Sequence, residues 1–258
     1  MPPITRRRFG VLMGGAASLA LGGCELPRFG WVLRGAVQDT AYQIQLPRPP
    51  RELDRRTLQG RLEARLASAL AAAKANTQAS GDHPSLREAS NRLRQALARS
   101  GVALAATAKG YGVDRLAAEL DTAGIAHYRL DLGSTSRFKG VNDAGYPWPI
   151  AIERPGGNTS TPLREVTLRD AAVATVGDDR KPSPASIAVV ADHGALAETL
   201  AMGLWAMGPE EGFALARGEG IAALFAAYAP NRRRFIQRTT SAFETRTGPL
   251  QGLNIHFM

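Results

Sequence analysis

The stretch TAKGYGVDRLAAELDTAGI, residues 107 to 125, places a lysine between small residues at the entry to an amphipathic pattern. Its apolar residues recur with helical spacing, and Gly124 follows where a left-handed residue commonly ends a helix. The stretch therefore predicts a helix over 110–124, preceded by a glycine-flanked turn that contains Lys109. Two roles fit this lysine: a clamp for a phosphate group, or a solvated residue at the helix entry.

The segments around this helix predict a mixture of helices and strands. Upstream, one apolar helical stripe comes from leucines spaced four residues apart, at positions 58, 62, 66 and 70. Another helix is predicted over 85–99, and the second half of 31–47 alternates like a strand. Downstream, strands are predicted on either side of a polar loop at 134–145, namely 127–133 and 147–155. Later elements are strands at 170–179 and 185–192, helices at 194–208 and 209–217, and strands at 220–228 and 233–243. The pattern predicts a single α+β domain over 24–258.

The composition is that of a globular chain with a basic surface. Of its 258 residues 44% are hydrophobic, which is enough to bury a core, and the formal net charge is +9. No aromatic motif for stacking on bases accompanies this charge, so we expect no nucleic-acid partner. Attraction to an anionic lipid or to a phosphate-bearing ligand is the better explanation.

The first 23 residues predict an export signal that is not part of the fold. Residues 5–9, TRRRF, are similar to the twin-arginine signal, and an apolar run follows them. The sequence LGGC at 21–24 is similar to a bacterial lipobox, in which Cys24 is lipidated and becomes the N-terminus. Cys24 is the only cysteine of the chain, so it has no partner for an internal disulfide. We expect a lipoprotein on a bacterial membrane that faces the periplasm; an ordinary signal peptide or a short membrane anchor is the alternative.

Six motifs follow one another between about residues 109 and 228. In order they are ATAKGYGVDRLAAELDTAGI, LDLGS, WPIAIERPGG, AAVATVGDDR, SIAVVAD and ALAETLAMGLWAMGPEEGFALA. Together with a weaker match, GAVQDTAYQI at 35–44, they resemble the FAD:protein FMN transferases, the ApbE family. The resemblance implies a T-fold-like domain that transfers FMN from FAD to a threonine of a target flavoprotein, with magnesium as cofactor. FAD, that flavoprotein and the membrane are the expected partners.

The resemblance also implies roles for individual residues. Lys109 and Gly110 would meet the phosphates of FAD, since a cation offsets charge at a pyrophosphate and a glycine lets the backbone approach it. Thr175 and Tyr42 are the other residues implied to bind the flavin. The most specific match is the A-K-G-Y-x-V-D element at 108–114.

The implied metal positions depart from the family pattern A-D-x-L-x-T. This chain has Glu198 and Met202 at the two ligand positions, alongside the carbonyl of Ala174. A glutamate still offers oxygens to magnesium, whereas the soft methionine sulfur is a poor ligand, and Met202 is otherwise a core residue. Asp178 and Asp179 are alternative oxygen donors, unless they are simply exposed acids of a turn.

Two further departures leave the catalytic residue unassigned. The family acid six residues before the lysine is Ala103 here, and the family segment H-I-I-D-P-x-T-G is missing after 179–180. An impaired transferase is therefore expected. The alternative is a non-catalytic accessory lipoprotein that binds flavin or a flavoprotein.

Overall fold

The computed structural model describes residues 30–75, 95, 108–156, 162–178, 185–228 and 235–248. Within these ranges eight strands form one antiparallel sheet in the order β1-β2-β3-β4-β7-β8-β9-β10, and β5 and β6 form a separate pair. The strands of the large sheet are β1 (Trp31–Val37), β2 (Thr40–Leu46), β3 (Tyr128–Leu132), β4 (Thr135–Lys139), β7 (Ala171–Asp178), β8 (Ala185–Ala191), β9 (Ala222–Tyr228) and β10 (Phe235–Thr239). The small pair is β5 (Trp148–Ile152) and β6 (Arg164–Leu168).

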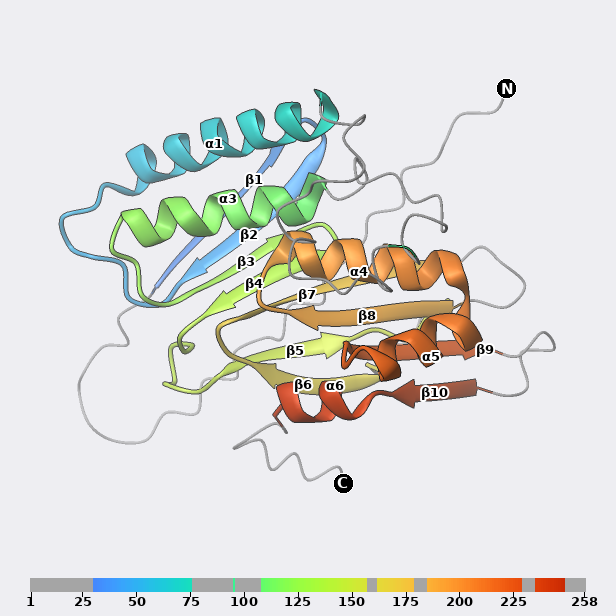
Figure 1. Cartoon of the computed structure of the whole chain (residues 1–258). Helices are drawn as coiled ribbons and strands as arrows, with labels where there is room; N and C mark the ends of the chain where they lie inside the picture. The colour runs from blue at the N-terminus through green and yellow to red at the C-terminus, as the bar shows by residue number, and fades with distance from the viewer. Residues whose placement is uncertain are drawn as a thin grey trace.

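Helices cover one face of the large sheet, and the small strand pair covers the other (Figure 1). The helices are α1 (Arg55–Ala75), α3 (Ala108–Thr122), α4 (Gly194–Met207), α5 (Pro209–Gly218) and α6 (Ser241–Arg246). The first four pack on the same face, with α3 between α1 and α4, and α6 lies with the small pair. The helices predicted at the leucine stripe, 110–124, 194–208 and 209–217 are all confirmed.

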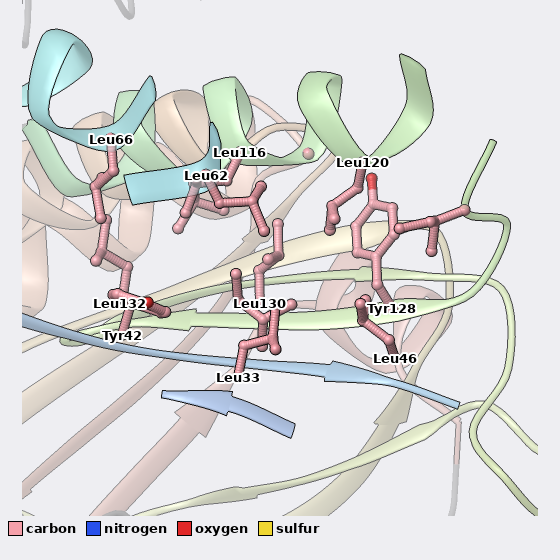
Figure 2. Packing of buried hydrophobic residues seen from close by; sticks show 14 of the residues in the cluster. Leu33, Tyr42, Leu46, Leu62, Leu66, Leu116, Leu120, Tyr128, Leu130 and Leu132 are labelled. Atoms are coloured by element: carbon pink, nitrogen blue, oxygen red, sulfur yellow. The ribbon is translucent and has the colours of Figure 1, made fainter. Parts of the chain in front are cut away.

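The first core cluster lies between α1, α3 and strands β1 to β3 (Figure 2). Each leucine of the α1 stripe is at most 4% exposed. Leu116 and Leu120 of α3 point into the same layer, where Leu130 and Leu132 of β3 meet them. Burying one leucine side chain contributes about 2 kcal/mol, so this stripe is what holds α1 on the sheet.

Two further clusters lie on opposite faces of the other half of the sheet. Against β7, β8 and β9, the helices α4 and α5 bury Ala197, Leu204 and Leu215. On the other face, β5, β6 and α6 enclose Phe138 and Phe243. Alternate residues of the shared strands therefore serve opposite faces, as the pleat of a strand requires.

The N-terminal hairpin is longer than predicted. Both halves of the segment 31–47 are strands, and β1 pairs with β2 along its whole length. Gln38 and Asp39 form the turn with φ of 47° and 64°, the left-handed conformation that matches the twist of a tight hairpin. The sequence of β1 alternates weakly because Leu33 is its one buried residue.

Two other predicted segments are wrong in part. The segment 134–145 is not all loop, because its first half is β4, which pairs with β3 and β7. The segment was predicted as a loop because it is polar, but its polar residues have partners in the fold. Arg137, for example, is paired with Asp114 of α3. The segment 233–243 divides into β10 and α6, where Thr240 caps the helix through its side chain. Strand β6 was not predicted at all.

Some predictions fall outside the described residues. These are the export signal at 1–23, the lipidated Cys24 and, apart from the helical Gln95, the helix over 85–99. None of the helices that the structure describes is long and apolar enough to cross a membrane.

Candidate functional site

The first turns of α3 and α4 meet above the sheet, and two glycines set their separation. A Cβ on Gly110 would lie 2.4 Å from the carbonyl oxygen of Gly194, and a Cβ on Gly194 would lie 2.8 Å from the carbonyl oxygen of Gly110. Only glycine permits backbones to approach this closely. The close approach of α4 accounts for a glycine at position 110. The contact with a phosphate that the resemblance implies for Gly110 stays a prediction.

Asp114 of α3 caps the N-terminus of α4. Its Oδ1 accepts a hydrogen bond from the backbone N–H of Gly194 at 2.8 Å, and its Oδ2 accepts one from Ala195 at 2.9 Å. Arg137 of β4 donates to Oδ1 at 2.7 Å and fixes the carboxylate. A carboxylate suits this place because the first N–H groups of a helix lack partners within it and carry partial positive charge. His193, at the N-cap position, makes no side-chain cap of its own.

Glu198 of α4 binds the first turn of α3 in return. Its Oε2 accepts a hydrogen bond from the backbone N–H of Gly110 at 2.6 Å, and the residue is only 3% exposed. Burial raises the pKa of Glu198 to about 7. The Gly110 hydrogen bond and the Lys109 ammonium oppose this rise in pKa, and the Asp114 carboxylate adds to it. Each helix thus supplies a carboxyl group to the first turn of the other: Asp114 of α3 binds α4, and Glu198 of α4 binds α3.

Lys109 lies within the first turn of α3, where a turn ahead of the helix was predicted. The structure describes α3 from Ala108 onwards, so Lys109 is part of the helix. The half-buried side chain of Lys109 crosses Gly133 in the turn between β3 and β4, where a Cβ would lie 3.1 Å from Lys109 Cδ. Gly133 has a φ of 61°, which also favours glycine. A cation therefore stands at the edge of the junction, next to a buried carboxyl group.

Of the predicted site residues, the structure brings together Lys109, Gly110 and Glu198. Tyr42 lies apart, in the core beneath α1, and its hydroxyl donates to Glu63 Oε1 at 2.5 Å. Its ring packs over Gly35 of β1, where a Cβ would lie 2.7 Å from it. This packing accounts for the Gly–Tyr spacing within the fold. The flavin-binding role implied for Tyr42 stays a prediction.

Thr175 and Ala174 lie on opposite faces of β7. Ala174 packs beneath α4, whereas Val173 and therefore Thr175 face the side of β5 and β6. The Thr175 side chain therefore points away from the helix layer that contains Lys109. The flavin-binding role implied for Thr175 stays a prediction. Its backbone N–H donates to the carbonyl of Ser134 on the β4 side at 3.0 Å. Backbone groups alternate along an antiparallel strand, so the Ala174 carbonyl is directed towards β8 and away from the helix layer.

The described residues fit magnesium poorly. Met202 lies one turn beyond Glu198; it is half-buried and belongs to none of the core clusters, so the expected core role is not met either. The hydroxyl of Thr199 is committed to the carbonyl of Ala195 at 2.7 Å. Among the described residues no group of three His, Cys, Asp or Glu side chains could hold a metal. Magnesium needs near-octahedral oxygen ligation, and the two carboxyl groups of this junction, Glu198 and Asp114, already accept hydrogen bonds from backbone amides.

Of the two alternative oxygen donors, the structure describes one. Asp178 is the last residue of β7, and Asp179 lies outside the described residues. A cavity of about 510 Å³ also lies elsewhere, at the C-terminal end of α4, lined by Trp205, Phe225 and Ile236 among others. We assign the candidate site to the junction because the charged groups converge there.

Comparison with known proteins finds one family. The model of the ApbE family matches residues 54–184, slightly more than half of the chain. The chain is 34% identical over 145 residues to an FAD:protein FMN transferase of Vibrio cholerae, covering 48% of this chain and 43% of that protein. It is 30% identical over 181 residues to one of Haemophilus influenzae, covering 60% of this chain and 51% of that protein. The chain thus spans about half the length of the curated relatives it matches.

Solved structures share the fold. The flavin transferase ApbE from Vibrio cholerae superposes with a TM-score of 0.66 at 21% identity, over 84% of this chain and 99% of that chain. The apo form of the flavinyl transferase ApbE from Pseudomonas stutzeri gives a TM-score of 0.62 at 21% identity, over 85% and 97% of the two chains. At these identities the likeness establishes the fold, and it confirms the predicted α+β domain of this type.

Proposed function

Because the chain belongs to the ApbE family, we propose that it transfers FMN from FAD to a threonine of a target flavoprotein. The matched relatives, which are named FAD:protein FMN transferase, support the reaction class. Within this chain the observation that carries the proposal is the junction where Lys109 stands beside the buried Glu198 and the first turn of α3.

The reaction exchanges one phosphoester for another. The threonine oxygen forms a bond to the phosphorus of FMN, while the P–O bond that links FMN to AMP breaks. AMP leaves with the bonding electron pair, and the threonine proton passes to a base. Negative charge grows on the phosphate oxygens, so a positioned cation stabilises the transition state. Lys109 supplies that charge.

Magnesium would add a second positive charge at the pyrophosphate. Because the described residues fit the ion poorly, we expect weak magnesium binding and slow transfer. The same observation favours a second candidate function. With Glu198 bound to the Gly110 amide and Met202 at the next ligand position, the chain would bind FAD or a flavoprotein without transfer, as an accessory protein.

We further propose an extracytoplasmic location, with a lipid on Cys24 as the membrane anchor. The support is the sequence of the first 24 residues, in which a twin-arginine-like start and an apolar run precede the single cysteine. Positive net charge suits a chain held near an anionic lipid surface.

The test of transfer uses the purified lipidated protein in detergent, with FAD, magnesium and a candidate flavoprotein. Covalent flavin is read as fluorescence on the flavoprotein after denaturing electrophoresis, and released AMP is measured in parallel. Lys109→Ala should weaken FAD binding about 10-fold to 150-fold, the value of a charge-assisted contact. The matched control is Lys139→Ala, which removes a half-exposed lysine paired with Asp121 at the surface.

The two candidate functions predict different results. Covalent flavin and AMP in equal amounts support transfer. FAD binding that depends on Lys109, without covalent product, supports the accessory protein. A wild-type chain that does not bind FAD would contradict transfer and flavin binding alike, and would leave only an accessory protein that binds the flavoprotein.

A further inference from the structure

Thr135 is a buried polar residue with an unused hydrogen-bonding group. The residue is 0% exposed, and its Oγ1 has no hydrogen-bond partner among the described residues. Burying a hydroxyl without a partner costs free energy, and a valine would fill the same space without that cost. In native structures such groups call for an explanation, and a ligand is one of the few available.

The sheet register places this hydroxyl beneath the α3–α4 junction. Thr135 opens β4 opposite Leu132 of β3 and opposite Ala174 of β7. Leu132 packs beneath α3, and Ala174 packs beneath α4. Side chains of directly paired residues face the same side of a sheet. The Thr135 side chain therefore points into the helix layer, at the line where the two helices meet.

The neighbours of Thr135 on β4 connect it to the charged groups. Arg137, two residues along on the same face, donates to Asp114 at the cap of α4. On the other side lies the β3–β4 turn, where the side chain of Lys109 crosses Gly133. Thr135 thus lies between these two points, next to the turn that Lys109 covers.

We propose that the Thr135 hydroxyl donates a hydrogen bond to a phosphate oxygen of FAD, alongside the Lys109 ammonium. An ammonium group and a hydroxyl donor next to a helix N-terminus form a set suited to an anion. The contact requires Lys109 to lift from Gly133, which its flexible side chain achieves by rotation about single bonds. Because Lys109 lies over Gly133, two residues before Thr135, this rotation would open the turn next to the hydroxyl. This inference rests on the proposed function, since it names FAD as the source of the phosphate.

The test compares four variants of the full chain in magnesium-free buffer with EDTA. Thr135→Val removes the hydroxyl at constant shape, and Thr135→Ser restores it. Ser186→Ala is the matched control, because Ser186 is the other described residue with a buried hydroxyl that has no partner, and it is remote in the sheet at the start of β8. Lys109→Ala reports on the proposed function itself. FAD affinity is measured by flavin fluorescence, and urea denaturation without flavin gives the stability of each variant.

Thr135→Val should weaken FAD binding roughly tenfold, with an unchanged or higher urea midpoint. Thr135→Ser and Ser186→Ala should bind FAD like the wild type. Unchanged affinity in Thr135→Val while Lys109→Ala binds weakly would overturn this inference and leave the proposed function intact. A lower urea midpoint in Thr135→Val would overturn it by showing that the hydroxyl has a structural partner. An affinity loss that appears only with magnesium would also overturn it, in favour of a metal ligand. Absence of FAD binding in the wild type would overturn both proposals.

Discussion

The buried position of Glu198 disfavours the ionised form of its carboxyl group. Its carboxyl group is buried against the first turn of α3, and burial raises its pKa from 4.5 to about 7 because a carboxylate inside the protein loses its hydration. In the unfolded chain the group titrates near its ordinary pKa. Between these two pKa values the folded state binds more protons than the unfolded state. The free energy of unfolding must therefore fall as the pH rises through this window, and it levels off above pH 7.

Replacing Glu198 by glutamine should remove this fall in the free energy of unfolding with rising pH. Without magnesium or flavin, the unfolding free energy of the wild type should fall by about 3 kcal/mol between pH 5 and pH 8. Glu198→Gln keeps an oxygen for the Gly110 N–H and has no proton to lose, so its unfolding free energy should change little over this range. Urea denaturation at several pH values measures both slopes.

Glu63→Gln is the matched control for this experiment. The Tyr42 hydrogen bond lowers the pKa of Glu63, so the effect of its titration on stability falls mainly below pH 5. This variant should keep the wild-type slope between pH 5 and pH 8. Equal slopes in the wild type and Glu198→Gln would show that another group titrates in this range.

The residues of the junction differ in how far sequence could predict them. Lys109 and Glu198 could be found because both lie in motifs that resemble the family, within helices that the apolar spacing predicts. The faces on which Thr175 and Tyr42 lie could not be predicted, since the face that a strand residue presents depends on the register of the whole sheet. Asp114 belongs to the quoted A-K-G-Y-x-V-D element, yet its partners are backbone amides of a helix far along the chain.

At the scale of elements, two helical glycines should respond oppositely to substitution, because only Gly110 lies at the contact between α3 and α4. Gly60 lies on the exposed side of α1, and nothing lies within 4 Å of a Cβ placed on it. Gly60→Ala should therefore raise the unfolding free energy by about 0.5–1 kcal/mol through helix propensity. Gly110→Ala should lower it by about 1–3 kcal/mol, because the new Cβ would meet the Gly194 carbonyl and push the helices apart.

Thermal or urea denaturation of the two alanine variants measures this difference in sign. The loss in Gly110→Ala should appear together with weaker FAD binding, since Lys109 is the neighbouring residue. A stabilised Gly110→Ala would mean that the helices do not approach closely in solution.

Strands were predicted less well than helices, for a physical reason. Strand β4 is central in the sheet, but Arg137 and Ser136 on it are paired with acids, so its sequence reads as a polar loop. Strand β1 is at an edge and buries little. Helices α3, α4 and α5 each carry enough periodic apolar residues and terminal glycine or proline signals to be located from sequence alone.

For the whole molecule, the helix layer has two apolar parts with a polar line between them. One part is the cluster under α1 and α3, and the other is the cluster under α4 and α5. Lys109, Asp114, Thr135, Arg137 and Glu198 all lie where these parts meet. A single sheet spans both clusters, and each cluster packs separately on it. The packing of both clusters therefore fixes the positions of the charged groups between them. The candidate site is a consequence of how the two halves of the layer join.

The location of the whole molecule depends on Cys24. If Cys24 carries the lipid, Cys24→Ser should move the protein from the membrane to the soluble periplasmic fraction, because the remaining chain would be held only by charge. The membranes should be washed at high salt, which screens attraction between a basic chain and anionic lipids. The companion variant, Arg6→Lys with Arg7→Lys, should hold the precursor in the cytoplasm by disabling the export signal. Immunoblots of the fractions measure both results. A serine variant that stays on salt-washed membranes would contradict the lipid anchor and favour an uncleaved apolar segment at the N-terminus.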